Sequence, residues 1–182
     1  MRASLTQLSR FILVLCAFMT VLSSSSQTPA NANPQKQKVL NLMSEGSNYF
    51  LKGDYEKAIG PYQKALDLEK EKPTLDKTLW KVLVDNLGMS YGISGNLDKA
   101  KEMFEYGISK DPDYPMFYYN MACTYGEKKD MDKAIEYLKE AFDRRDNMIP
   151  GEEMPDPATD SSFERFMNSE KFKAALKELK HK

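Results

Sequence analysis

The stretch VDNLGMSY, residues 84–91, decides the fold of this chain, because its pattern of small and large residues returns along the sequence. The stretch YYNMACTY, residues 118–125, repeats it 34 residues later (118 − 84 = 34), and LMSEGSNY, residues 42–49, repeats it upstream. Each copy ends in tyrosine and carries glycine or alanine three residues before it. A second apolar pattern follows each copy: Ala58-x3-Tyr62, Ala100-x3-Phe104 and Ala134-x3-Leu138. One structural unit is therefore used repeatedly.

This period and spacing resemble the tetratricopeptide repeat (TPR), a helix–turn–helix unit. Such units stack into a solenoid with a concave surface. The resemblance covers Val39 to about Asp146, although the first repeat has Glu45 in place of the usual Leu and Lys70 in place of the closing Pro. It implies an all-α, TPR-like helical-hairpin solenoid of about three repeats with C-terminal capping helices.

The sequence divides into four parts: a signal peptide at 1–32, the solenoid at 33–146, a loop at 147–160 and capping helices at 161–182. The first two repeats are 42 residues apart (88 − 46 = 42), which we interpret as extra helical turns on both sides of Pro73. The third helix is then expected to start near Thr74. Gly53 suits a left-handed helix C-cap, and Asp54 is expected to cap the second helix.

The loop is rich in proline and acid and precedes a short amphipathic segment. Glu152, Glu153, Asp156 and Asp160 match no EF-hand spacing, so we expect no metal site there. Asp160 is more simply a helix cap, and Ser161-x-x-Glu164 fits a capping box.

Small residues in each repeat should let two helices approach closely, and large residues three or four positions away should fill the remaining space. The predicted packing positions are Gly46, Tyr49, Ala58, Gly88, Tyr91, Ala100, Phe104, Ala122, Tyr125 and Ala134.

Residues 1–32 have the pattern of a secretory signal peptide: basic Arg2 and Arg10, an apolar run from 11 to 22, and an Ala-x-Ala pattern ending at Ala32. The run is shorter than the roughly 20 apolar residues of a transmembrane helix. A lipoprotein signal would need a small residue before Cys16, where Leu15 stands. We expect export to the periplasm or secretion, with cleavage after Ala32 or Ser26.

Composition excludes several classes of function. Removing residues 1–32 leaves 24 basic and 27 acidic residues, a net charge of −3 (24 − 27), which argues against nucleic-acid binding. The remaining cysteine, Cys123, is expected to be a small buried hydrophobe, with a redox thiol as the alternative. The only histidine, His181, stands one residue from the C-terminus. We therefore predict no enzyme activity, no cofactor and no metal.

By resemblance, the functional surface is a groove lined by the first helix of each repeat. The candidate peptide groove comprises Met43, Ser47, Phe50, Asp85, Asn86, Met89, Met116, Tyr119 and Asn120, with Cys123 beside them. Related co-chaperones grip a C-terminal carboxylate with Lys, Asn, Asn, Lys and Arg. Here those positions are Met43, Ser47, Asn86, Met116 and Asn120, and only Asn86 matches. Either the groove is open to a peptide, or the C-terminal helices fold back into it.

The sequence thus predicts a non-catalytic protein–protein interaction adaptor or scaffold of the cell envelope, binding a partner protein or peptide in the concave groove. The alternative is a structural, self-assembling subunit of an envelope complex, so a homo-oligomer is left open. We expect no integral membrane segment after signal cleavage.

Overall fold

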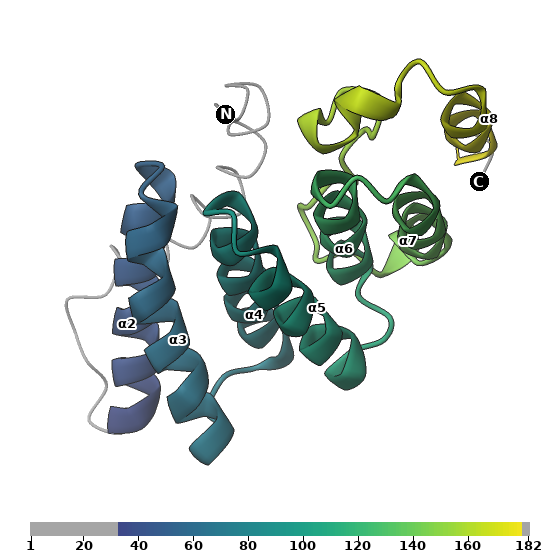
Figure 1. Cartoon of the computed structure of the whole chain (residues 1–182). Helices are drawn as coiled ribbons and strands as arrows, with labels where there is room; N and C mark the ends of the chain where they lie inside the picture. Colours follow the sequence, from purple (N-terminus) through teal and green to yellow (C-terminus); the bar gives the residue numbers. More distant parts are fainter. Residues whose placement is uncertain (1–32, 180–182) are drawn as a thin grey trace.

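The structure is a computed structural model, and it describes residues 33–179, within which every regular element is a helix (Figure 1). The predicted signal peptide and His181 lie outside these residues. Three hairpins follow one another: α2 and α3, α4 and α5, and α6 and α7. Their bounds are Pro34–Leu51, Tyr55–Glu71, Lys77–Ile93, Leu97–Lys110, Pro115–Glu127 and Met131–Asp143. The turns η1 (Arg145–Asn147) and η2 (Ser161–Phe166) precede α8 (Glu170–Leu179). The predicted all-α, TPR-like fold class is confirmed.

The turn inside each hairpin has one repeated backbone geometry. Gly53 and Gly95 have φ of 78° and 88°, and Lys129, at the equivalent position of the third hairpin, has φ of 65°. In each turn the next amide donates to the carbonyl of the tyrosine that ends the repeat pattern, with N···O distances of 2.9 Å in all three. These bonds satisfy helix carbonyls that would otherwise lack partners. The third turn forms the same bond, although Lys129, unlike glycine, is strained at positive φ.

The structure contradicts two predicted caps and confirms one. The side chain of Asp54 makes no capping hydrogen bond to α3, and its carboxylate instead pairs with Lys57 Nζ at 2.9 Å. At η2 the predicted cap Asp160 is confirmed, because its Oδ1 accepts from the Ser162 amide at 2.9 Å, whereas Ser161 is not the capping residue that the predicted capping box required.

The predicted start of the third helix near Thr74 is wrong, because α4 begins at Lys77. The buried Glu69 carboxylate, on α3, accepts the backbone N–H of Thr74 at 2.9 Å and that of Leu75 at 3.0 Å. It also accepts the Thr74 hydroxyl. These bonds hold the connection in a loop until Asp76 caps α4 through the Leu79 amide. The extra residues of the first repeat thus form a longer α3 and a carboxylate-centred loop.

Inside the first two hairpins, a glycine lies against an aromatic ring. A Cβ added to Gly46 would come within 2.7 Å of the Tyr62 ring, and one added to Gly88 within 2.5 Å of the Phe104 ring. Ala58, Ala100, Ala122 and Ala134 are fully buried, whereas Tyr49, Tyr91 and Tyr125 are half-buried. Two of the half-buried tyrosines also contact residues of other helices. Tyr91 donates to Gln63 Oε1 on the preceding hairpin, and Tyr125 stacks on Tyr137.

The C-terminal elements close the last hairpin. Figure 1 shows α8 beside α7, with η2 over the end of α6. The Ser162 carbonyl is so close to Gly126 that an added Cβ would lie 2.5 Å from its oxygen. Phe163 and Phe172 are fully buried, and their rings pack in a tilted arrangement with centres 5.7 Å apart. Residues 160–179 are therefore packed firmly on the end of the solenoid.

Candidate protein-binding face

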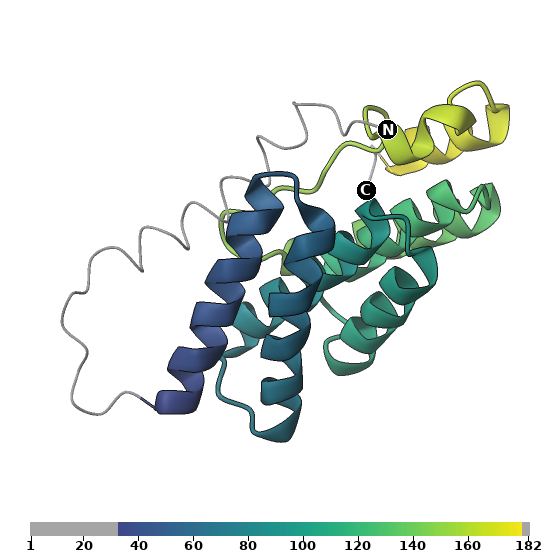
Figure 2. The ribbon, with the colours of Figure 1, turned by 60° about the vertical axis from the view of Figure 1, so that its left-hand side comes forward.

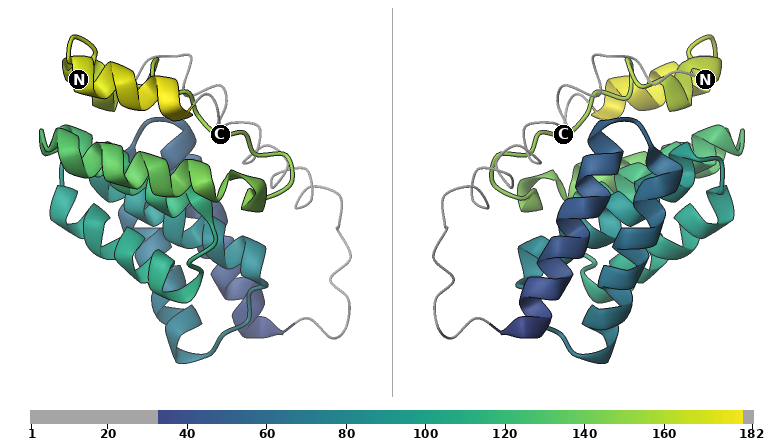
Figure 3. Two further views of the ribbon diagram at one scale, coloured as in Figure 1. Left: turned by 90° about the vertical axis from the view of Figure 1, so that its right-hand side faces the viewer. Right: turned by 90° about the vertical axis from the view of Figure 1, so that its left-hand side faces the viewer.

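The first helices of the hairpins, α2, α4 and α6, carry the nine predicted groove residues. All nine are buried, from 1% exposure for Met43 and Tyr119 to 9% for Met89. Residues 148–160 pass along this side of the molecule on the way from η1 to η2, as the turned views show (Figures 2 and 3). We call the nine residues the groove positions, and the part of this passing chain from 148 to 159 the covering segment.

The groove positions of α2 and α4 meet around a buried hydroxyl. Ser47 Oγ and Tyr62 OH lie 3.0 Å apart. Burial raises the pKa of Tyr62 well above its ordinary value, and the hydrogen bond from Ser47 opposes that rise. The Asn86 Nδ2 beside them is buried and makes no hydrogen bond of good geometry within residues 33–179. Met43, Phe50 and Met89 belong to the apolar core.

Between α4 and α6, the groove positions form a direct polar link. Asn120 Nδ2 donates to Asp85 Oδ1 at 2.8 Å, and both side chains are buried. Burial, together with the negative charge of Glu152, raises the pKa of Asp85 to about 7, while the Asn120 bond opposes the rise. Asp85 is thus an acid that is readily neutral inside this face.

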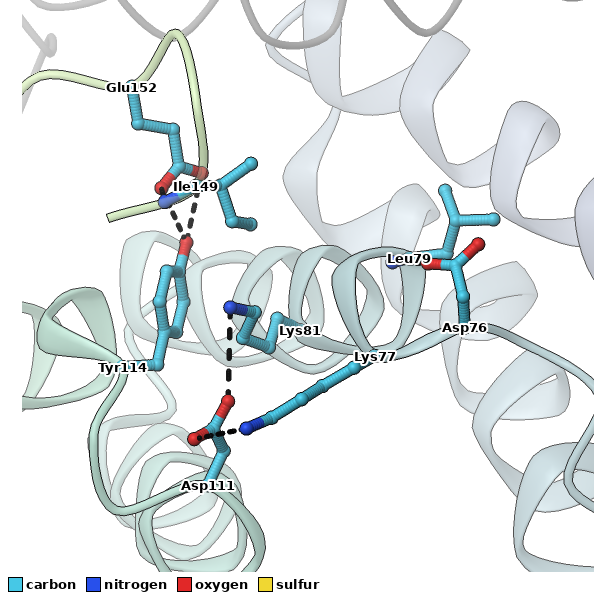
Figure 4. Close-up of polar contacts among 8 residues, drawn as sticks. All are labelled: Asp76, Lys77, Leu79, Lys81, Asp111, Tyr114, Ile149 and Glu152. Carbon is cyan, nitrogen blue, oxygen red and sulfur yellow. Dashed lines mark hydrogen bonds and ion pairs between the residues drawn. The ribbon is translucent and has the colours of Figure 1, made fainter. Parts of the chain in front are cut away.

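A cationic and phenolic site lies one to two turns before Asp85, toward the start of α4 (Figure 4). Lys77 Nζ lies 3.1 Å and Lys81 Nζ 3.8 Å from the carboxylate of Asp111, which is 3% exposed. Lys81 Nζ also lies 4.6 Å from the centre of the Tyr114 ring. Tyr114 donates its hydroxyl to Glu152, at 2.9 and 3.0 Å from the two oxygens. The Glu152 side chain of the covering segment is therefore bound by a tyrosine that lies beside a lysine.

Burial is the largest cause of the pKa shifts in this site. Burial raises the pKa of the Glu152 carboxyl, whereas the bonds from Tyr114 and the Ile149 amide and the charge of Lys81 oppose the rise. The pKa of the Tyr114 hydroxyl is raised well above its ordinary value, first by burial and then by the charges of Asp85 and Glu152. Tyr114 is thus a hydrogen-bond donor at neutral pH, which suits a carboxylate acceptor.

A second acidic side chain attaches the C-terminal segment to α6. Asp160 Oδ2 accepts from Tyr119 OH at 3.0 Å and from Cys123 Sγ at 3.7 Å. Burial and then the charge of Asp160 raise the pKa of the Cys123 thiol well above its usual range. A nucleophilic or redox thiol needs a lowered pKa, so this environment favours the structural interpretation of Cys123. Tyr119, a groove position, is covered by the chain itself.

Sequence reasoning named Asp85, Tyr119 and Asn120 but missed the residues that bind the covering segment. Tyr114, Lys81 and Asp111 were not singled out, and Glu152 was considered only as a metal ligand. One signal was available: the spacing of Lys77, Lys81 and Asp85 puts charged residues along one side of a helix that is otherwise buried. Glu152 gives no local signal, because its partner stands 38 residues away in sequence.

The described residues offer little for other kinds of site. Among residues 33–179 no cluster of three or more His, Cys, Asp or Glu side chains is arranged to hold a metal ion. Over the same range, none of the helices combines the length and apolarity needed to cross a membrane.

Residues 84–114 and 117–147 match the family model for the tetratricopeptide repeat. The chain contains tetratricopeptide repeats. The matches correspond to the hairpins of α4 and α5 and of α6 and α7, and the hairpin of α2 and α3 lies before them.

Three proteins illustrate the similarity. Photosystem I assembly protein Ycf3 of Rippkaea orientalis (strain PCC 8801 / RF-1) is 27% identical over 125 residues, covering 61% of this chain and 69% of that protein. The Yersinia enterocolitica type III secretion translocator chaperone SycD, solved as an alternative dimer, has a TM-score of 0.54 at 20% identity, covering 80% and 93% of the two chains. Pseudomonas aeruginosa PcrH in complex with the chaperone-binding region of PopB has a TM-score of 0.54 at 16% identity, covering 84% and 99%. The likeness to the two solved structures concerns the fold alone.

Proposed function

We propose that this protein is a non-catalytic adaptor of the cell envelope that binds a non-helical segment of a partner protein on the face formed by α2, α4 and α6. The observation that carries the proposal is that this face already holds an irregular stretch of polypeptide, in which the Glu152 amide donates to the Ile149 carbonyl at 2.9 Å. Tyr114, just before α6, binds Glu152 of the covering segment through its hydroxyl group. Tyr119, on α6, binds Asp160 in the same way. A surface that holds its own chain this way has the donors needed to hold another.

The similar proteins support this class of function. One is named an assembly protein, and one was solved with a binding region of another protein on it. The first name refers to assembly and the second to a complex with another protein, and both fit a binding function. The repeat architecture is suited to that role, because a stack of hairpins presents a long continuous surface.

Location in the envelope is supported by the pattern of residues 1–32 alone. Cell fractionation of the full chain and N-terminal sequencing of the mature protein test it. We expect the protein outside the cytoplasm, beginning after Ala32 or after Ser26. A cytoplasmic protein that begins at its initiator end would overturn the envelope assignment and leave the binding function standing.

The binding function is tested by photocrosslinking in the native host. Ile93 is 49% exposed and lies one turn beyond Met89 on α4, so a photoreactive residue there reports on the edge of the face. The matched control places the same residue at Lys64, which is exposed on α3. We expect one protein to be captured from position 93 and not from 64. Identical capture at both positions contradicts the proposal, and capture of only a second copy of this chain assigns the face to self-assembly.

A further inference from the structure

Half of the covering segment is exposed: Pro150, Gly151, Glu153, Asp156, Ala158 and Thr159. Ile149 is 7% exposed and Pro157 is buried. Glu152 is half-buried against Tyr114, Met148 and Met154 are half-buried against the apolar core, and Pro155 is half-buried. No helix occurs between 148 and 159. A stretch of irregular chain with this much exposure opens at a lower free-energy cost than a packed helix.

The chain on either side of the covering segment is held more firmly. On one side, Arg144 donates to the Pro112 carbonyl at 2.8 Å and lies over the Tyr118 ring at 4.3 Å. On the other, Phe163 is fully buried, and the backbone at Ser162 packs against Gly126. The covering segment is thus a connection between two firmly packed points of the chain.

The site that the covering segment occupies favours a carboxylate side chain. It offers the Tyr114 hydroxyl as a donor and the Lys81 ammonium beside it, both suited to a carboxylate. Three residues before Glu152, Ile149 fills an apolar site, and its amide also donates to Glu152 Oε2 at 3.2 Å. Because Lys77 and Lys81 are also paired with Asp111, the preference for a carboxylate rests mainly on the donor hydroxyl of Tyr114.

We infer that the covering segment is a built-in competitor for the partner, and that the partner binds as a non-helical acidic segment whose carboxylate replaces that of Glu152 against Tyr114 and Lys81. This inference rests on the proposed function and names the partner's chemistry and its regulation. The covering segment keeps the face closed until a better-fitting acidic segment displaces it. Because the competitor is tethered, its effective concentration is high, and a free peptide of the same sequence binds the intact protein poorly.

The test uses the full mature chain and a fluorescent synthetic peptide with the sequence of residues 147–160, followed by fluorescence anisotropy. In one protein variant, Glu152→Gln weakens the attached competitor without changing its size. Glu153→Gln is the matched control, since Glu153 is its exposed neighbour. We expect the Glu152→Gln protein to bind the peptide about tenfold more tightly than the wild-type or Glu153→Gln proteins, because a charge-assisted hydrogen bond has been taken from the competitor alone.

Two further measurements assign the contact. A peptide carrying Glu152→Lys should lose binding to the Glu152→Gln protein. Adding Tyr114→Phe to that protein should weaken binding of the unchanged peptide by about tenfold, since the receptor donor is then gone. Circular dichroism melting of each variant confirms that it is folded before its affinity is compared.

The outcomes separate this inference from the proposed function. Equal peptide affinity for all folded variants, or no binding by any, overturns the inference and makes the covering segment a permanent part of the fold. Capture from position 93 tests the proposed function independently of this result. Concentration-dependent dimers of the Glu152→Gln protein in light scattering overturn it in favour of a second copy as the occupant.

Discussion

Replacing Asp85 by Asn should stabilise this protein at alkaline pH and leave its stability unchanged at acidic pH. Asp85 is buried, and its Oδ1 accepts a hydrogen bond from Asn120. Asparagine has the same shape and keeps an oxygen at that position, so the bond to Asn120 survives. The substitution removes only the negative charge that Asp85 carries when it is ionised.

The magnitude follows from the change in proton affinity on folding. Burial and the charge of Glu152 raise the pKa of Asp85 from 3.8 to about 7. Between about pH 4 and pH 7 the folded protein therefore holds one more proton than the unfolded chain, and its free energy of unfolding falls as the pH rises. The loss is complete above the folded pKa and amounts to about 4 kcal/mol for a rise of this size. The Asp85→Asn protein lacks this loss.

The assay is urea unfolding at pH 5, 6, 7 and 8, followed by the fluorescence of Trp80, the only tryptophan, which packs edge-on against Phe117. Titrating groups that do not interact with Asp85 are common to both proteins and cancel in the difference. Asp67→Asn, at an exposed site on α3, is the control, and its difference from wild type should stay flat. If Asp85→Asn proves less stable than wild type at pH 8, the carboxylate is ionised and stabilised in the fold, and the reasoning fails.

Three further substitutions test the packing and the turns. Lys129→Gly relieves the left-handed residue of the third turn and should stabilise the protein by about 1 kcal/mol in thermal melting, whereas Lys128→Gly, at a right-handed position, should destabilise it. Gly126→Ala forces a Cβ against the Ser162 carbonyl and should destabilise by about 1–3 kcal/mol, whereas Gly92→Ala, whose Cβ would lie at an ordinary 3.5 Å from Ala100, should stabilise by about 0.5–1 kcal/mol. Glu69→Ala removes the acceptor for two loop amides and should cost about 2–4 kcal/mol; an effect below 0.5 kcal/mol would contradict the account of the α4 start.

The fold could be predicted because its determinants are local and repeated. The glycine at 88 and the aromatic ring at 104 stand in the same repeat, and the structure places them in contact. Helix ends were accessible wherever a glycine or proline marks them. The second hairpin shows this, because α4 ends at Ile93 and α5 begins at Leu97, on either side of Ser94-Gly95-Asn96. Such signals depend only on neighbours within one or two turns.

What could not be predicted depends on partners distant in sequence or unusual in role. The start of α4 was placed too early because a buried glutamate rarely caps a loop that follows its own helix, and nothing in the spacing of Glu69 and Thr74 indicates it. The third turn was not recognised as left-handed, because Lys129 stands where the other two hairpins have glycine. The contact between Tyr114 and Glu152 depends on the path of an irregular loop, which has no periodicity to read.

The placement of two acids near each other on this face is itself an argument about binding. Asp85 comes from α4 and Glu152 from the covering segment, and the charge of Glu152 contributes to the raised pKa of Asp85. A surface built only to hold its own loop for good would gain from an apolar residue at either position, because a buried acid pair costs free energy unless each member is well paired. Lys81 and Tyr114 balance one carboxylate, not two. An incoming carboxylate in the place of Glu152 meets the same acid, so the charge of Asp85 favours neither occupant. Displacement of the covering segment therefore depends on apolar contacts better than those of Ile149, which the incoming segment has to supply.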